Sequence, residues 1–234
     1  VAELRPLARL LADWDPAPPM PHPARADAAP FAAARRAKLS AQLPDRLIAV
    51  PAGVLKTRAN DTEYAFRASS TFAWLTAETA AEAVLVMYPL AGGHRSVLYI
   101  LEYVAPGEIG YFTDRLHGAL WVGGVPNPAQ TGQLLGIETR GRERLAADLA
   151  PYRDAPAAVL TGFDPQVDAL LPAGTPDDLE RIADELRLAK DDWEVARLQD
   201  ACDATTRGFA DVVRELPMVL AQGGRRGRMS LVQE

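Results

Sequence analysis

The chain has 234 residues, of which 48% are hydrophobic and 24% charged, an ordinary globular composition. Its 25 basic and 31 acidic residues give a formal net charge of −6, which argues against a nucleic-acid-binding protein. A single cysteine, Cys202, excludes a disulfide within the chain, and no apolar run approaches the roughly 20 residues of a membrane span. We therefore expect a cytoplasmic protein that binds neither nucleic acid nor membrane.

Residues 1–30 are predicted to form a helix followed by an extended arm. Apolar residues recur at helical spacing near the start of the chain. Six prolines then fall between residues 15 and 30, and this density excludes a regular helix.

An α/β domain is predicted for residues 31–175. A helix is expected over Phe31–Leu43, because a proline follows it, and a short strand over Arg46–Val50. The strongest strand signals are Glu82–Tyr88 and Ser96–Tyr103, which are rich in β-branched and aromatic residues. The Gly-Gly-His loop between them predicts an antiparallel hairpin.

Farther along the chain, predicted helices and strands alternate. The helices cover Pro128–Leu135, Arg142–Leu149 and Pro165–Leu171, and the strands cover Ile137–Thr139 and Ala157–Thr161. Strands that alternate with helices imply parallel pairing through crossovers. The predicted fold class is therefore α/β, with a mixed β-sheet flanked by helices on both faces.

Two further helices are predicted, over Asp177–Leu186 and Asp191–Leu216, with Pro217 ending the second. The second helix is the longest, and its apolar positions recur at alternating spacings of three and four residues. These seam positions are Val195, Leu198, Cys202, Thr205, Phe209, Val212 and Leu216. A small residue on such a seam is expected to be buried, so Cys202 is predicted to be a core residue and not a nucleophile.

The chain offers few residues for catalysis. Its histidines are His22, in the proline-rich arm, and His94 and His117, which we expect to be solvated loop residues. No HExxH, CxxC or GxSxG motif and no phosphate-binding loop occurs. We therefore predict no catalytic residue and no metal ligand in this chain.

The segment Thr57–Ala77 mixes charged and aromatic residues at a spacing that fits neither a regular helix nor a regular strand. Such stretches often form a shaped binding rim. The alternative is an ordinary connection in which Arg58 pairs locally with Asp61, and composition alone favours this second interpretation.

Within this segment, residues 58–67 read RANDTEYAFR, which resembles the signature of the amino-terminal domain of aminopeptidase P, in the creatinase and prolidase superfamily. Ordered flanking features agree, including Arg35 and Arg36 in the first helix, the strand at Ala83–Met87 and the LWVG element at Leu120–Gly123. The sequence of residues 184–194 resembles the segment that opens the family's catalytic half. The resemblance extends over about residues 31–216.

The resemblance implies a non-catalytic, amino-terminal domain of an Xaa-Pro aminopeptidase, a metallopeptidase that removes the residue preceding proline. It places two divalent metals, usually manganese, in a carboxyl-terminal pita-bread domain that this chain lacks, so the chain alone is expected to be inactive. Residues 176–234 would then be a linker helix and the first helix of that domain. The implied partners are the chain's own catalytic domain, further copies of the chain in a dimer or tetramer, and a peptide substrate with proline at its second position.

In oligomers of this family, the amino-terminal domain reaches toward a neighbouring active site. By motif, the residues that would line this substrate-access rim are Arg58, Asp61, Tyr64, Arg67 and Trp121. The alternative for Trp121 is burial in the domain core, and for Asp61 the capping of a local turn. A prolidase, a creatinase-like hydrolase and a free-standing, degenerate binding protein all remain open as other interpretations of the chain.

Overall fold

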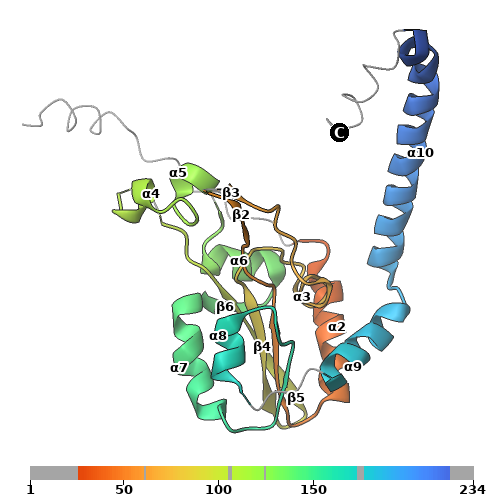
Figure 1. Cartoon of the computed structure of the whole chain (residues 1–234). Helices are drawn as coiled ribbons and strands as arrows, with labels where there is room; N and C mark the ends of the chain where they lie inside the picture. Colours follow the sequence, from red (N-terminus) through yellow and green to blue (C-terminus); the bar gives the residue numbers. More distant parts are fainter. Residues whose placement is uncertain (1–25, 61, 105–106, 124, 173–176, 222–234) are drawn as a thin grey trace, which may run out of the picture. The chain divides into compact units, whose positions relative to one another are not determined.

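A computed structural model describes residues 26–60, 62–104, 107–123, 125–172 and 177–221, and Figure 1 traces them. The predicted amino-terminal helix and most of the proline-rich arm therefore lie outside the described residues. Two compact units are present, one ending at Leu188 and the other beginning at Ala189. Each unit is described by itself.

The first unit is built on a five-stranded mixed sheet with the order β6-β5-β4-β1-β7. Its strands are β1 (Leu47–Pro51), β4 (Val84–Leu90), β5 (Gly93–Ile100), β6 (Glu138–Gly141) and β7 (Ala157–Val159). The three central strands pair antiparallel, whereas β6 and β7 join the two edges in parallel. The predicted mixed sheet and its hairpin are confirmed.

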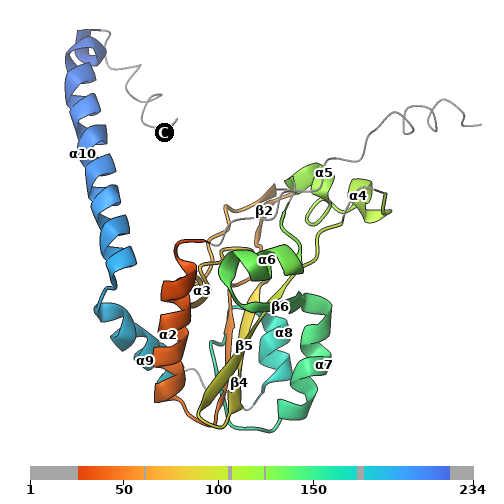
Figure 2. The ribbon, with the colours of Figure 1, turned by 180° about the vertical axis from the view of Figure 1, so that it is seen from behind.

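Helices cover both faces of this sheet, as predicted, because alternate residues of each strand point to opposite sides. Leu85 and Met87 of β4 pack with one group of helices, and Val84 and Val86 pack with the other. The first group comprises α2 (Ala29–Gln42), α3 (Ser70–Thr76), α6 (Pro128–Leu135) and α9 (Asp177–Leu188). The second comprises α7 (Leu145–Leu149) and α8 (Pro165–Leu170). Figure 2 shows α2 and α9 on one side of the sheet and α7 and α8 on the other.

The remaining elements of this unit are short. They are β2 (Thr57–Ala59), β3 (Thr62–Glu63), α4 (Gly110–Thr113), α5 (Ala119–Val122) and the 3-10 turns η1 (Arg142–Arg144) and η2 (Ala150–Tyr152). In Figure 1, β2, β3, α4 and α5 lie beyond the same end of the sheet, and Figure 2 shows β2, α4 and α5 there as well.

The compact unit continues beyond residue 175, where the α/β domain was predicted to end. Leu179 and Ala183 of α9 are fully buried, and Ile182 and Leu186 pack against the core that α2 also covers. By its contacts, α9 is thus a covering helix of the sheet.

The second unit contains one long helix, α10 (Asp192–Ala221). The prediction that Pro217 ends this helix is wrong: the proline lies inside it. Proline removes one backbone donor but its fixed φ is compatible with helix, so the chain can continue past it at a cost. The prediction that Cys202 is buried is also wrong, because Cys202 is exposed and no side chain of α10 is buried. The spacing of apolar residues predicts which face of a helix is apolar, but it does not show whether another part of the protein covers that face.

Among the described residues, no helix is both long and apolar enough to cross a membrane.

A polar network lies where β5 and β6 meet α7. The Tyr99 hydroxyl donates to Asp148 over 2.8 Å, and Arg140 donates to the same carboxylate over 2.6 Å. Burial by itself would raise the pKa of Asp148, but the hydrogen bonds from Arg140 and Tyr99 outweigh burial and hold it below its ordinary value. Hydrogen bonds from Arg95 and Arg140 likewise hold the pKa of Glu138 below its ordinary value.

Acid is expected to weaken the fold through these two carboxylates. A carboxyl whose pKa is lower in the folded state stabilises the fold above its unfolded pKa, near pH 4, and loses that contribution as pH falls through its folded pKa. Because both groups are partly solvated, we expect a loss of about 1 kcal/mol or less. Urea unfolding at pH 7, 5 and 3 measures it. Arg140→Met should flatten the pH dependence below pH 5, and an unchanged slope would contradict this assignment.

Candidate functional site

Of the predicted rim residues in the segment 57–67, Arg58 lies on β2, and Tyr64 and Arg67 lie in the stretch after β3, which is neither helix nor strand. Arg58, Tyr64 and Arg67 are all exposed, Tyr64 at 60% of its surface. The backbone of Tyr64 is held in place, since its N–H donates to the Lys56 carbonyl over 2.9 Å. Asp61 lies outside the described residues, so neither its rim role nor its predicted pairing with Arg58 is tested.

The predicted rim residue Trp121 lies on α5, in the segment 107–123 that we call the α4–α5 tip. Its side chain is 55% exposed, so the alternative of burial in the domain core is not what the structure shows. The indole N–H donates to the Phe112 carbonyl over 3.2 Å, which fixes the ring against α4. Other apolar side chains of the tip are also exposed, namely Ile109, Phe112, Leu116, Leu120 and Val122.

His117 of this tip lies near two carboxylates, and backbone hydrogen bonds from Val104 N–H to the His117 carbonyl and from Ala119 N–H to the Val104 carbonyl join the tip to the preceding strand end. His117 Nδ1 lies 3.0 Å from Asp114 Oδ2, and its Nε2 lies 3.9 Å from Glu82 Oε1. The hydrogen bond from His117 is the main reason that the pKa of Asp114 lies below its ordinary value. His117 lies in a turn, as expected, but its side chain is not fully solvated, because only 25% of it is exposed and it lies between two carboxylates.

Glu82 is in turn anchored to the core by its backbone. It has a φ of 60°, its N–H donates to the Gly53 carbonyl over 2.7 Å, and its own carbonyl accepts from Arg142. Arg142 also donates to Asp164 over 2.6 Å, and both side chains are almost completely buried. A buried ion pair therefore holds the turn that contains Glu82.

Two neighbouring arginines of α2 hold the helix that follows the hairpin. Arg35 donates to the Trp74 carbonyl over 3.0 Å and Arg36 to the Leu75 carbonyl over 2.7 Å, at the carboxyl-terminal end of α3. Cations are favoured there because the unsatisfied carbonyls carry partial negative charge. Burial lowers the pKa of Arg36 to about 10. The sequence resemblance singles out this Arg-Arg pair, but its capping role emerges only from the structure.

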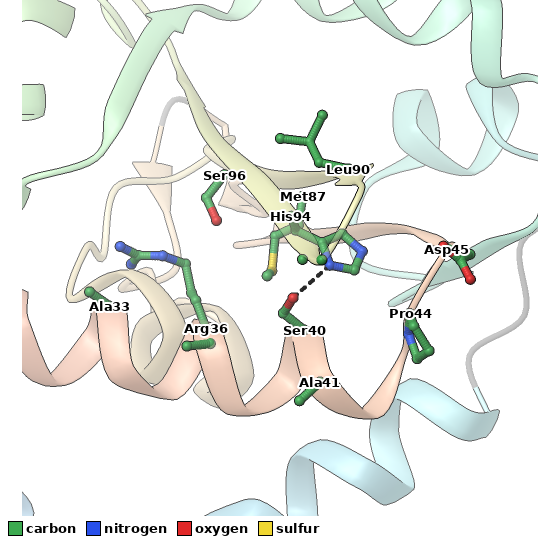
Figure 3. A pocket seen from close by; sticks show the side chains of 13 residues that line it. Ala33, Arg36, Ser40, Ala41, Pro44, Asp45, Met87, Leu90, His94 and Ser96 are labelled. Atoms are coloured by element: carbon green, nitrogen blue, oxygen red, sulfur yellow. Dashed lines mark hydrogen bonds between the residues drawn. The ribbon is translucent and has the colours of Figure 1, made fainter.

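A cavity of about 530 Å³ lies between α2 and the β4–β5 hairpin. Figure 3 shows Ser40 of α2 pointing toward His94 of β5, to which it is hydrogen-bonded, with Arg36 one helical turn away. His94 is half-buried and hydrogen-bonded on both ring nitrogens, so the expectation of a solvated loop histidine is wrong here. Sequence reasoning missed Ser40, because residues 40 and 94 carry no shared motif.

The family resemblance implies a centre of two divalent metals. No group of three His, Cys, Asp or Glu side chains that could hold a metal ion occurs among the described residues. The described residues therefore do not fit such a centre.

Comparison with known proteins gives a consistent picture. Residues 32–154 match the model of the aminopeptidase P amino-terminal domain. Xaa-Pro aminopeptidase 1 from Streptomyces coelicolor is 42% identical over 199 residues, covering 82% of this chain and 40% of that protein. Xaa-Pro aminopeptidase 2 from the same organism is 38% identical over 205 residues, covering 86% and 43%.

Solved structures agree at the level of the fold. Aminopeptidase P from E. coli superposes with a TM-score of 0.50 at 21% identity, over 65% of this chain and 32% of that one. The enzyme from Yersinia pestis gives the same TM-score and identity over 62% of this chain. The chain spans about two fifths of the length of the curated relatives it matches.

Proposed function

The chain belongs to the aminopeptidase P amino-terminal domain family, and from that premise we propose that it is the non-catalytic domain of a cytoplasmic, metal-dependent Xaa-Pro aminopeptidase. The reaction of the whole protein is removal of the amino-terminal residue from peptides whose second residue is proline. The observation that carries this proposal is the 42% identity to a protein named Xaa-Pro aminopeptidase 1, over most of this chain. These names also favour this peptidase over a prolidase or a creatinase-like hydrolase.

In this proposal, the chemistry lies in sequence beyond the present chain. Two divalent metals, manganese by resemblance to the family, would supply a Lewis acid and an activated water there. The proposal is supported by the large remaining length of the relatives and by the lack of a metal-binding group among the described residues.

The exposed seam of α10 is the proposed contact with that catalytic part. Val195, Leu198 and Phe209 are 54%, 52% and 69% exposed, although burying such a side chain contributes about 1.5–3 kcal/mol. A helix of 30 residues with this much uncovered apolar surface is typical of a segment that packs against a further domain or subunit.

The proposed role of the rim is to shape substrate access, in this subunit or in a neighbouring one of a homo-oligomer. Arg58, Asp61, Tyr64, Arg67 and Trp121 are its proposed members. The exposure of Trp121 and Tyr64 supports it, because aromatic side chains that are rigid and partly solvated are typical of recognition surfaces.

Activity measurements on two forms of the protein test this function. A form extended through the catalytic part is expected to cleave peptides with proline second at least about a hundredfold faster than matched peptides with alanine second, because buried recognition contacts discriminate strongly. A chelator should abolish cleavage and manganese should restore it. The 234-residue chain alone should cleave neither peptide. Equal cleavage of both peptides, or cleavage of either by the chain alone, would refute the proposal.

A further inference from the structure

The cavity between α2 and the β4–β5 hairpin contains a serine and a histidine in the arrangement of an activated nucleophile. Ser40 Oγ lies 2.8 Å from His94 Nδ1, and His94 Nε2 lies 2.7 Å from the Arg46 carbonyl oxygen. A hydroxyl, a base within hydrogen-bond reach and a third group that orients the base are the signature of nucleophilic catalysis. The dashed line in Figure 3 marks the Ser40–His94 bond.

The contacts of His94 define its tautomer. A carbonyl oxygen can only accept a hydrogen bond, so Nε2 must carry a proton to donate to the Arg46 carbonyl. In the neutral imidazole, Nδ1 then holds a lone pair, and the Ser40 hydroxyl must be the donor to it. The serine proton therefore already points at the base that would remove it.

The surroundings of the pair suit a small electrophile. Ser40 and His94 line the same cavity of about 530 Å³, with apolar walls from Met87 and Leu90. Arg36 lines it as well, on the same face of α2, one turn from Ser40. Its guanidinium donates to the Leu75 carbonyl over 2.7 Å, so the reactive groups of the cavity are Ser40 and His94.

We propose that Ser40 is a nucleophilic serine, activated by His94, that accepts an acyl group from a small activated ester bound in this cavity. The Ser40 proton passes to His94 Nδ1 as Oγ forms a bond to the acyl carbon. The bond between that carbon and the ester's alcohol oxygen breaks, and the alcohol leaves with the proton returned by His94. The products are acyl-Ser40 and the free alcohol. This activity is separate from the proposed peptidase function, because the cavity lies in the described domain and uses none of the rim residues.

Treatment of the 234-residue chain with p-nitrophenyl acetate tests the proposal. Release of p-nitrophenolate is followed by absorbance, the number of acetyl groups by intact mass, and their position by peptide mapping. We expect one acetyl group per chain, on Ser40, and no acetyl group at this position in Ser40→Ala. His94→Gln should acetylate about a hundredfold more slowly, the usual effect of losing a general base.

The matched control is Ser96→Ala. Ser96 lines the same cavity from β5, but its hydroxyl is not bonded to a histidine in the described structure, so this variant should acetylate at the native rate. Circular dichroism melting curves establish that each variant is folded. Even if His94→Gln does not fold, the map of the native chain decides the matter. Acetylation confined to lysines, equal acetylation of Ser96, or an unmodified chain would each show that Ser40 and His94 form only a structural contact, and would overturn the proposal.

Discussion

Replacement of Arg142 by methionine is expected to lower the free energy of unfolding by about 3–5 kcal/mol, the usual effect of removing one partner of a buried ion pair. The Asp164 carboxylate is only 1% exposed and would lose its cation. Arg142 also donates to the Glu82 carbonyl and, over 2.9 Å, to Gln166. The variant therefore leaves the buried Asp164 carboxylate without its cation, and the less buried oxygens of Glu82 and Gln166 lose the same donor. Urea unfolding at pH 7 measures the change.

An exposed ion pair of the same unit provides the control for this prediction. Arg181 and Asp178 lie 3.7 Å apart on α9, with 67% and 54% of their side chains exposed. Arg181→Met is expected to change the free energy of unfolding by less than about 1 kcal/mol, because solvent screens such pairs. If Arg142→Met were no more destabilising than Arg181→Met, the anchoring role assigned to Arg142 would be wrong.

The sequence predicted the elements that local signals define, but it did not predict the ion pair between Arg142 and Asp164. The strands and their hairpin were predictable, because runs such as residues 84–88 (VLVMY) are continuously apolar and bounded by turn residues. Helix α6 was predicted with its observed bounds, since Asn127 and Gln130 form a capping box around Pro128. Both signals act over a few residues. Arg142 and Asp164, by contrast, lie 22 residues apart in the sequence. No local pattern indicates that they are partners.

Two other differences have the same origin. The β4–β5 turn takes only Ala91 and Gly92, because Leu90 pairs with Gly93. His94 therefore lies on a strand beside α2, where a looser loop was predicted. In α10, spacing predicted a helix correctly but gave no means of knowing whether its seam is covered. Local patterns thus indicate elements, whereas the contacts of Ser40, His94 and Cys202 depend on what the fold places next to them.

Trp121→Ala is expected to have the largest functional effect among the rim residues. In the form of the protein extended through its catalytic part, kcat/KM for a peptide with proline second should fall about 30-fold, which corresponds to about 2 kcal/mol of binding by an aromatic anchor. The fold should be little affected, because the ring is 55% exposed and surface substitutions usually change stability by less than about 0.5 kcal/mol. Steady-state kinetics with the full range of substrate concentrations separates KM from kcat.

A Leu120→Ala variant separates the contribution of the Trp121 ring to substrate binding from that of the rest of the α4–α5 tip. Leu120 is 44% exposed on the same helix, so Leu120→Ala removes apolar surface of the tip without touching Trp121. It should leave kcat/KM within about twofold of the native value, while Trp121→Ala raises KM with kcat nearly unchanged, the pattern of lost uniform binding. Sedimentation of both variants is needed, because a Trp121→Ala protein that also dissociates would have lost a subunit contact instead of a substrate contact. If the Trp121→Ala protein keeps its native assembly and its native kcat/KM, Trp121 is not part of the rim. A ring that lines the substrate entrance should affect the peptide that passes it.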